Sequence, residues 1–184
     1  MDGTLILSVL LGLGLSSAVG FRVFLPVLLT SVAAYLDQVQ LAESMMWLGS
    51  LPAMITFAVA TVMEILGYYI PFFDNLLDTI ATPAAVLCGS LLMGSTIVDM
   101  EPLVKWPVSI IAGGGIAGTI KGSSSILRVK SSGLTAGTAN PILTTVETVV
   151  SGIISVLSIL VPILAVVILV YLIYYFIIKK KVRT

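Results

Sequence analysis

The sequence predicts an all-α fold, that of a polytopic helical membrane protein in which some helices are broken or re-entrant. Hydrophobic residue types make up 58% of the 184 residues and charged types only 10%, and the mean hydropathy is +1.16. A soluble domain carries about 25% charged residues, so this chain has too little charge to cover a surface that faces water. Long apolar runs, interrupted by Gly, Pro and Arg, supply the helices. We therefore expect residues 1–184 to form a single transmembrane domain in contact with the lipid bilayer.

The residue counts exclude several kinds of function. Nine basic and nine acidic residues give a net charge of +0, so nothing indicates a nucleic acid as a partner. The chain has no histidine, which excludes Ser-His-Asp and Cys-His catalysis and His-ligated zinc or haem. The single cysteine, Cys88, cannot form an intrachain disulfide. We expect no cofactor, no metal and no enzymatic activity.

The apolar run 4–36 is longer than one crossing needs. A Gly-Phe-Arg sequence that ends at Arg22, and then Pro26, interrupt it, so two shorter helices are expected at 4–19 and 23–36. No basic residue precedes this run, and we therefore expect a permanent membrane segment rather than a secretory signal.

Three further helices are expected in the middle of the chain. The run 48–73 is long enough for a full crossing and contains Glu64. The run 79–98 opens with a Thr-Pro pair, and Pro83 suits the first turn of a helix because its missing N–H would be unpaired there. The run 106–120 is short and rich in glycine. Small residues, which let helices approach closely, occur at Ala81, Ala85, Gly89, Gly114 and Gly118.

The last apolar run, 142–178, is too long for one straight crossing. As a single helix it would reach about 55 Å at about 1.5 Å per residue, against a hydrocarbon core of about 30 Å. It is interrupted at Pro162, and it must kink, tilt, project from the membrane or split in two. Tyr171, Tyr174 and Tyr175, followed by basic residues at 179–183, predict an interface anchor and a cytoplasmic C-terminus in the cell membrane.

Polar residues mark the predicted connections at 37–47, 99–105 and 121–140. The last of these is rich in Ser, Thr and Gly. It carries the basic residues Lys121, Arg128 and Lys130.

Three charged residues lie within the apolar runs: Arg22, Glu64 and Glu147. A charge at membrane depth costs on the order of 3 kcal/mol, so it persists only where it faces a partner or water. One interpretation is that the three residues line a polar pocket or path. The other is a structural ion pair that fixes two broken helices. If Glu64 pairs with Arg22, both stay charged; if Glu64 is unpaired, it becomes a candidate for proton coupling.

Asp74 and Asp78 form a second acidic feature at a predicted membrane boundary. Their spacing of four puts both carboxylates on one face of a helical turn. With Asn75 they could hold a cation, whereas the interpretation that we favour is that they cap helix ends. Two aspartates on one helix face do not fit an aspartyl protease. We include both in the candidate substrate or ion pathway, with Arg22, Glu64 and Glu147.

The two halves of the chain, 1–78 and 79–178, resemble each other weakly. In the first, a Gly-Phe-Arg break leads to the segment that contains Glu64; in the second, the Gly/Ser/Arg stretch 122–128 leads to the segment that contains Glu147. Broken hydrophobic segments at corresponding positions of two halves indicate an inverted repeat with a site between them. We treat this repeat as a hypothesis.

Three stretches resemble a known family. They are GFRVFLPVLLTSVAA (20–34), MEILGYYIPFFDNLLD (63–78) and GTIKGSSSILRVKSSGLTAGTANPILTTVETVVS (118–151). Together they resemble the bacterial integral-membrane family called domain of unknown function 4126, over most of residues 12–165. The resemblance implies the membrane class and the importance of the three charged positions, but no activity. Here Ser123 to Ser125 stand where the family usually carries an Arg, and Thr148 follows Glu147 in place of a second acid.

Two functions fit these features. The first is a small transporter or channel for an ion or small molecule, in which half-helix ends present their dipoles to the substrate. A chain of 184 residues is small for a full pathway, so a homo-oligomer is expected. The alternative is a non-transporting membrane scaffold or accessory subunit, in which the buried charges are structural.

Overall fold

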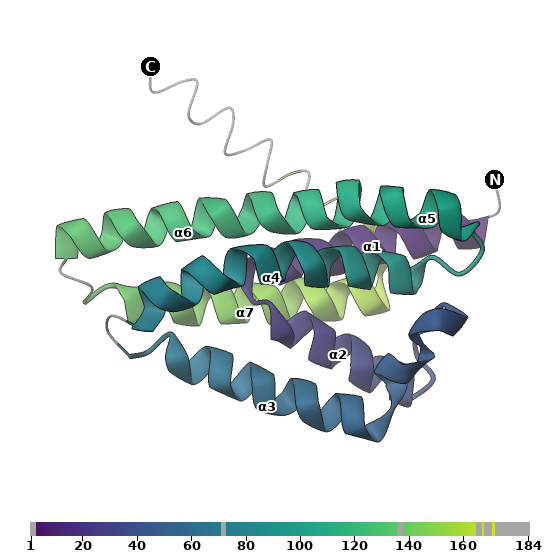
Figure 1. Ribbon diagram of the computed structural model, residues 1–184, viewed down its shortest axis with the longest axis horizontal. Coiled ribbons are helices and arrows are strands. Elements are labelled where there is room, and N and C mark those ends of the chain that lie inside the picture. Colours follow the sequence, from purple (N-terminus) through teal and green to yellow (C-terminus); the bar gives the residue numbers. More distant parts are fainter. Residues whose placement is uncertain (1–2, 71–72, 136–137, 165–166, 168–170, 172–184) are drawn as a thin grey trace, which may run out of the picture.

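The computed structural model describes residues 3–70, 73–135, 138–164, 167 and 171, and these residues contain helices and no β-strand. The helices are α1 (Gly3–Phe21), α2 (Phe24–Tyr35), the 3-10 helix η1 (Glu43–Gly49), α3 (Leu51–Gly67), α4 (Phe73–Thr96), α5 (Pro102–Val108), the π-helix η2 (Ser109–Gly114), α6 (Gly115–Thr135) and α7 (Asn140–Leu160). Helices α5, η2 and α6 follow one another as a single long rod (Figure 1).

The long helices form a bundle in which α1 packs against α4, α6 and α7 (Figure 1). Helix α2 turns back toward the end of the molecule at which α1 begins, so α1 and α2 form a hairpin, and α3 packs on the outer side of α2 (Figure 1). Four described segments are long and apolar enough to cross a membrane: Gly3–Phe21, Leu76–Thr96, Pro102–Thr135 and Asn140–Leu160. They indicate a multi-pass membrane protein.

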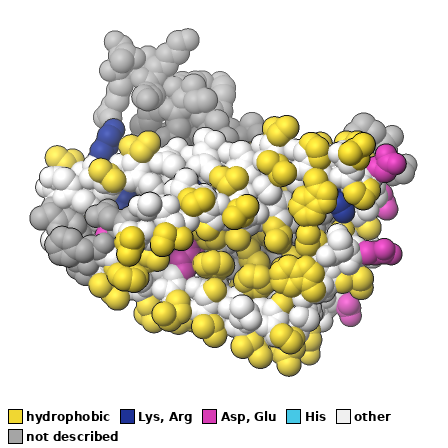
Figure 2. All heavy atoms as spheres, viewed as in Figure 1, with side chains coloured by type: hydrophobic (Ala, Val, Ile, Leu, Met, Phe, Trp, Pro, Cys, Tyr) yellow, Lys and Arg dark blue, Asp and Glu magenta, His cyan; other side chains and the backbone are white. Residues whose placement is uncertain are grey.

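Many polar side chains lie inside this bundle beside a buried apolar core, and many large apolar side chains lie on its outer surface. The buried face of α7 carries Asn140, Thr144, Glu147, Ser151, Ser155 and Ser158, whereas its exposed face carries Ile142, Val146, Val149, Ile153 and Val156. Hydrophobic side chains cover much of the visible face of the molecule (Figure 2). A soluble protein would reverse this pattern, whereas helices that face lipid require it.

The predicted break in the first apolar run is confirmed, because α1 ends at Phe21 and α2 begins at Phe24. The last run also breaks where expected: α7 ends at Leu160, and Val161 has φ −144° and ψ 77°. The proline that follows disfavours a helical conformation for this residue. The predicted anchor at Tyr174, Tyr175 and 179–183 lies outside the described residues.

The predicted connection at 121–140 is wrong over most of its length, because α6 continues to Thr135. Its polar composition has another cause. Lys121, Ser124 and Arg128 are all buried against the bundle, so the polar residues belong to the inner face of a helix rather than to a loop.

Helix α4 begins earlier than predicted, at Phe73, and Pro83 lies in its interior rather than in its first turn. A proline inside a membrane helix is tolerated where hydroxyl side chains and neighbouring helices support the backbone. Pro83 has no N–H to donate to the carbonyl of Thr79, four residues earlier, and the Thr82 hydroxyl donates to the adjacent carbonyl, that of Asp78, at 3.0 Å. The boundary between the suggested halves, 78/79, therefore lies inside α4, and the inverted repeat stays a prediction.

Small residues bring α4 into close contact with η2 and α6, as predicted. A Cβ atom added at Gly113 would lie 2.5 Å from the carbonyl oxygen of Gly89 and 2.6 Å from the Cβ of Met93. A Cβ added at Gly118 would lie 2.8 Å from a methyl carbon of Val86. Since real atoms do not approach so closely, these positions require glycine for the helices to pack at this distance.

We expect Gly113→Ala to lower the free energy of unfolding by about 1–3 kcal/mol, because the added methyl group overpacks the contact between α4 and η2. Unfolding in detergent, followed by circular dichroism, measures the change. Gly115→Ala is the matched control, since nothing lies within 4 Å of a Cβ added there. Equal stability of the two variants would contradict the packing argument.

Candidate functional site

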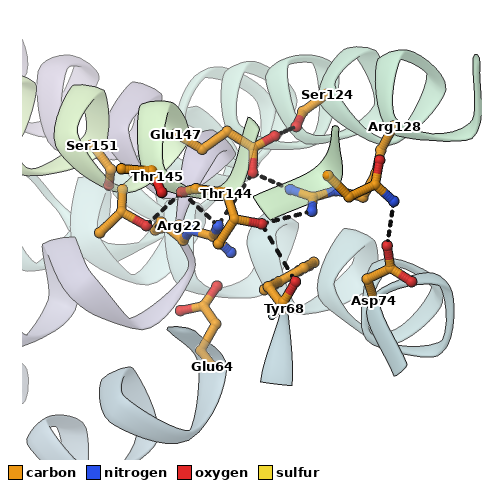
Figure 3. Close-up of polar contacts among 12 residues, drawn as sticks. Arg22, Glu64, Tyr68, Asp74, Ser124, Arg128, Thr144, Thr145, Glu147 and Ser151 are labelled. Atoms are coloured by element: carbon orange, nitrogen blue, oxygen red, sulfur yellow. Dashed lines mark hydrogen bonds and ion pairs between the residues drawn. The ribbon is translucent and has the colours of Figure 1, made fainter. Parts of the chain in front are cut away.

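Charged side chains from five parts of the fold converge inside the bundle (Figure 3). They come from the turn between α1 and α2, from the C-terminal end of α3, and from α4, α6 and α7. The three cations are 0% exposed and the three acids 7–9% exposed. We name this group the charge cluster; it consists of Arg22, Glu64, Tyr68, Asp78, Lys121, Arg128 and Glu147.

Arg22 joins the α1–α2 turn to α7. Its guanidinium donates from Nε to the Thr148 hydroxyl at 3.0 Å and from Nη2 to the Thr144 carbonyl at 2.9 Å. The same Nη2 lies 3.4 Å from a carboxylate oxygen of Glu147. The side chain is thus held by α7 along one edge, while its Nη1 is buried without a hydrogen bond.

Glu64 caps α2 from the neighbouring helix α3. Its two carboxylate oxygens accept hydrogen bonds from the backbone N–H groups of Val23 at 2.8 Å and Phe24 at 3.0 Å. The first N–H groups of a helix have no partner within the helix. The N-cap residue of α2, Val23, has no side chain that could accept a hydrogen bond from them. Of the two predicted alternatives for Glu64, neither holds: it is hydrogen-bonded, but to backbone rather than in an ion pair with Arg22.

Asp78 connects α4 to α6 and α3. One of its oxygens lies 2.9 Å from the Lys121 ammonium and also accepts a hydrogen bond from the Tyr68 hydroxyl at 2.8 Å. Its other oxygen lies 3.3 Å from Nε of Arg128. Asp78 is therefore a paired charge in the second turn of α4 and not the cap of a helix end.

Tyr68 lies at the centre of the charge cluster and is 2% exposed. Three cations surround its ring: the distances to the ring centroid are 4.3 Å for Arg22, 4.8 Å for Lys121 and 4.5 Å for Arg128. The negative faces of an aromatic ring attract cations, and more strongly when water is excluded. Lys121 also donates to the Tyr68 hydroxyl at 2.8 Å.

Glu147 is the acid that the two arginines share. Arg22 and Arg128 both pair with its Oε2, and the Ser124 hydroxyl donates to its Oε1 (Figure 3). Arg128 also donates to the Thr144 hydroxyl at 3.0 Å. Glu147 thus ties the α1–α2 turn, α6 and α7 together.

Asp74 is buried on α4, as Asp78 is. It accepts a hydrogen bond from α7. The Asn140 side-chain amide donates to Asp74 at 2.5 Å and to the Ser132 hydroxyl at 2.8 Å. The described residues contain no group of three or more acidic or cysteine side chains placed to hold a metal ion. Asp74 is thus linked to Asn140 at the start of α7, and Asp78 to Tyr68, Lys121 and Arg128.

Of the predicted site residues, the structure brings Arg22, Glu64, Asp78 and Glu147 together in the charge cluster, and it adds three that the sequence did not single out: Tyr68, Lys121 and Arg128. Lys121, Ser124 and Arg128 recur at the spacing of one helix face. That spacing was the available signal. No comparable signal distinguished Tyr68 from the neighbouring Tyr69, which is exposed.

Two hollows have residues of the charge cluster in their walls. A pocket of about 270 Å³ between α2, α3 and α4 includes Glu64 and Tyr68 in its lining. A cleft of about 490 Å³ between α4 and α6 is lined by Asp78, Thr79, Ser125, Val129 and Ser132. The Tyr68–Asp78 hydrogen bond therefore joins a residue of the pocket wall to a residue of the cleft wall.

We expect Glu147→Gln to lower the free energy of unfolding by about 3–5 kcal/mol, because it leaves two buried guanidinium groups without their shared acid. Chemical unfolding in detergent measures this loss. Glu43→Gln makes the same change at an exposed site in η1 and should alter stability by no more than about 0.5 kcal/mol. A similar small effect at both positions would show that the charge cluster does not stabilise the fold.

A family profile described as Domain of unknown function (DUF4126) matches residues 9–181. Comparisons with curated proteins and with solved structures found no match. The matched range contains every residue of the charge cluster and all helices after the start of α1. The chain therefore belongs to the DUF4126 family.

Proposed function

We propose that this protein is a small membrane transport protein whose charge cluster is the polar site of the pathway. The observation that carries the proposal is the hydrogen bond between Tyr68 and Asp78, whose two members lie in the walls of two different hollows. Rotation of the phenol away from Asp78 would remove the side-chain contact between them. Tyr68 is in this proposal the gate, and Asp78 is the group against which it closes.

The free-energy cost of burying the charge cluster at membrane depth supports a role beyond packing. Ionisable residues within membrane segments are expensive, and they commonly mark ion or substrate pathways. Here six charged residues are buried around one tyrosine. Well-packed apolar residues of similar volume are often as stable as buried ion pairs, or more so. Stability alone therefore gives little reason to keep so many charges at this depth.

A second candidate function is the non-transporting scaffold. The observation that favours it is that each acid of the charge cluster holds a group from another element: Glu64 holds the start of α2, Asp78 holds α6 and Glu147 holds the α1–α2 turn. Such cross-links would also fix a rigid surface for a partner. Flux measurements distinguish the two candidates, since a scaffold conducts nothing.

We further propose a cell-membrane location and a cytoplasmic position for the end of the bundle that carries Lys130. The exposed acidic residues Asp37, Glu43, Asp99 and Glu101 belong to η1 and to connections at the opposite end (Figures 1 and 2). An excess of Lys and Arg marks cytoplasmic segments. By the same rule the C-terminus, with its basic residues at 179–183, is cytoplasmic. We propose a homo-oligomer that is not an enzyme.

We expect Tyr68→Phe to raise the flux through the purified protein in liposomes by about tenfold, the effect of lowering a barrier by about 1.4 kcal/mol. The variant keeps the ring among the three cations but loses the hydroxyl that holds Asp78. Flux is measured over a panel of inorganic ions and small metabolites against empty liposomes.

Tyr69→Phe is the matched control, because the neighbouring hydroxyl is exposed and contacts Thr145 rather than the charge cluster. It should leave flux unchanged. No flux above empty liposomes for the wild-type protein, or equal flux in wild type and Tyr68→Phe, would argue against the gate and favour the scaffold.

A further inference from the structure

We infer that the pocket between α2, α3 and α4 binds an amphiphile that consists of a single alkyl chain with a protonated amine at its head. This inference deepens the proposed function, because it names the class of molecule that reaches the gate. Binding and transport are nevertheless separate measurements, so each can fail without the other.

The walls of the pocket are apolar and its mouth faces the lipid. Met63 and Ile80 line it and are 66% and 59% exposed on the outer surface of the bundle, whereas Val23 and Tyr68 are 1% and 2% exposed at its inner end. The exposed apolar side chains of membrane helices lie against acyl chains. An occupant therefore enters sideways from the bilayer, and an alkyl chain is the part that these walls accept.

Small side chains provide the space. Ala60 on α3 and Ala81 and Ala84 on α4 all line the pocket, whose volume is about 270 Å³. For comparison, an apolar cavity of about 150 Å³ accepts benzene. The pocket thus holds a larger apolar group than a single ring.

The charge of the head group follows from Glu64, the only charged residue in the described lining. Each of its carboxylate oxygens accepts one backbone hydrogen bond, and an ionised carboxylate offers about four acceptor sites in all. Acceptor capacity remains for a donor inside the pocket. The cations of the charge cluster are fully buried, and none of them lines the pocket.

An ammonium group suits this end of the pocket better than an acid. Few water molecules screen a charge among apolar walls, so attraction to a carboxylate and repulsion from it are both stronger there than in water. A bound amine at Glu64 would lie next to Tyr68, which also lines the pocket.

The test is photolabelling of the full-length protein in lipid nanodiscs. The probes are a single-chain alkylamine with a photoactivatable group at the end of the chain and the carboxylate of equal length, with labelled peptides identified by mass spectrometry. We expect the amine to label α3 and α4 around Ala60 and Ala84. The carboxylate should label them at least about tenfold less, a ratio that corresponds to about 1.4 kcal/mol.

Two variants and a control distinguish labelling by a probe bound in the pocket from labelling by a probe in the surrounding lipid. Ala84→Phe fills the pocket and should abolish selective labelling without touching the cap of α2. Glu64→Gln keeps the size of the side chain and should remove the preference for the amine. Val59→Phe adds the same bulk as the first variant at an exposed position of α3 outside the lining and should leave labelling unchanged.

Equal labelling by both probes, or amine labelling that survives Ala84→Phe, would overturn the inference. This holds even if Glu64→Gln fails to fold. Selective labelling without flux of the amine into liposomes would leave the binding site standing and count against the transport proposal. Flux of inorganic ions without selective labelling would support the transport proposal and count against the binding site.

Discussion

The rest of the structure depends on one constraint, which is that a charge within a membrane protein must find its partner inside the protein. Three cations and three acids meet this constraint around Tyr68, and almost every pairing joins different helices. A guanidinium left without its acid costs several kcal/mol, so each pairing fixes the relative position of two elements. The α1–α2 turn, α4, α6 and α7 are thus held at one place by charge, and the small residues then set how closely they pack.

The same constraint explains the α1–α2 hairpin. A chain that turns back inside a membrane protein exposes backbone N–H groups where no bulk water can satisfy them. Glu64 satisfies two of these groups at the start of α2, and Arg22 extends from the same turn to α7. The positive end of the α2 dipole faces the carboxylate as well. A residue that looks like a pathway carboxylate in the sequence is therefore also the group that makes the turn possible.

Much of the fold was predictable from sequence, because apolar runs, the Gly-Phe-Arg break and Pro162 are local signals. The isolated charges Arg22, Glu64 and Glu147 were equally visible against their apolar surroundings. The partners were not, since Arg22 and Thr148 are separated by 126 positions. Lys121 and Arg128 lie in a stretch whose average polarity is that of a connection, although it forms a helix whose polar face is the buried one. In membrane proteins the spacing of polar residues is more informative than their number.

The arrangement of charges also bears on what can approach the site. The cations lie behind the acids: Arg22, Lys121 and Arg128 are fully buried, while Asp78 lines the cleft and Glu64 lines the pocket. A molecule in either hollow therefore meets a carboxylate first. The two acids differ in what neutralises them, because Asp78 is paired with two side-chain cations whereas Glu64 is held by neutral backbone N–H groups. The charge of Glu64 is thus balanced by the positive end of α2 and by the nearby Arg22, whereas Asp78 is balanced by direct contact with Lys121 and Arg128.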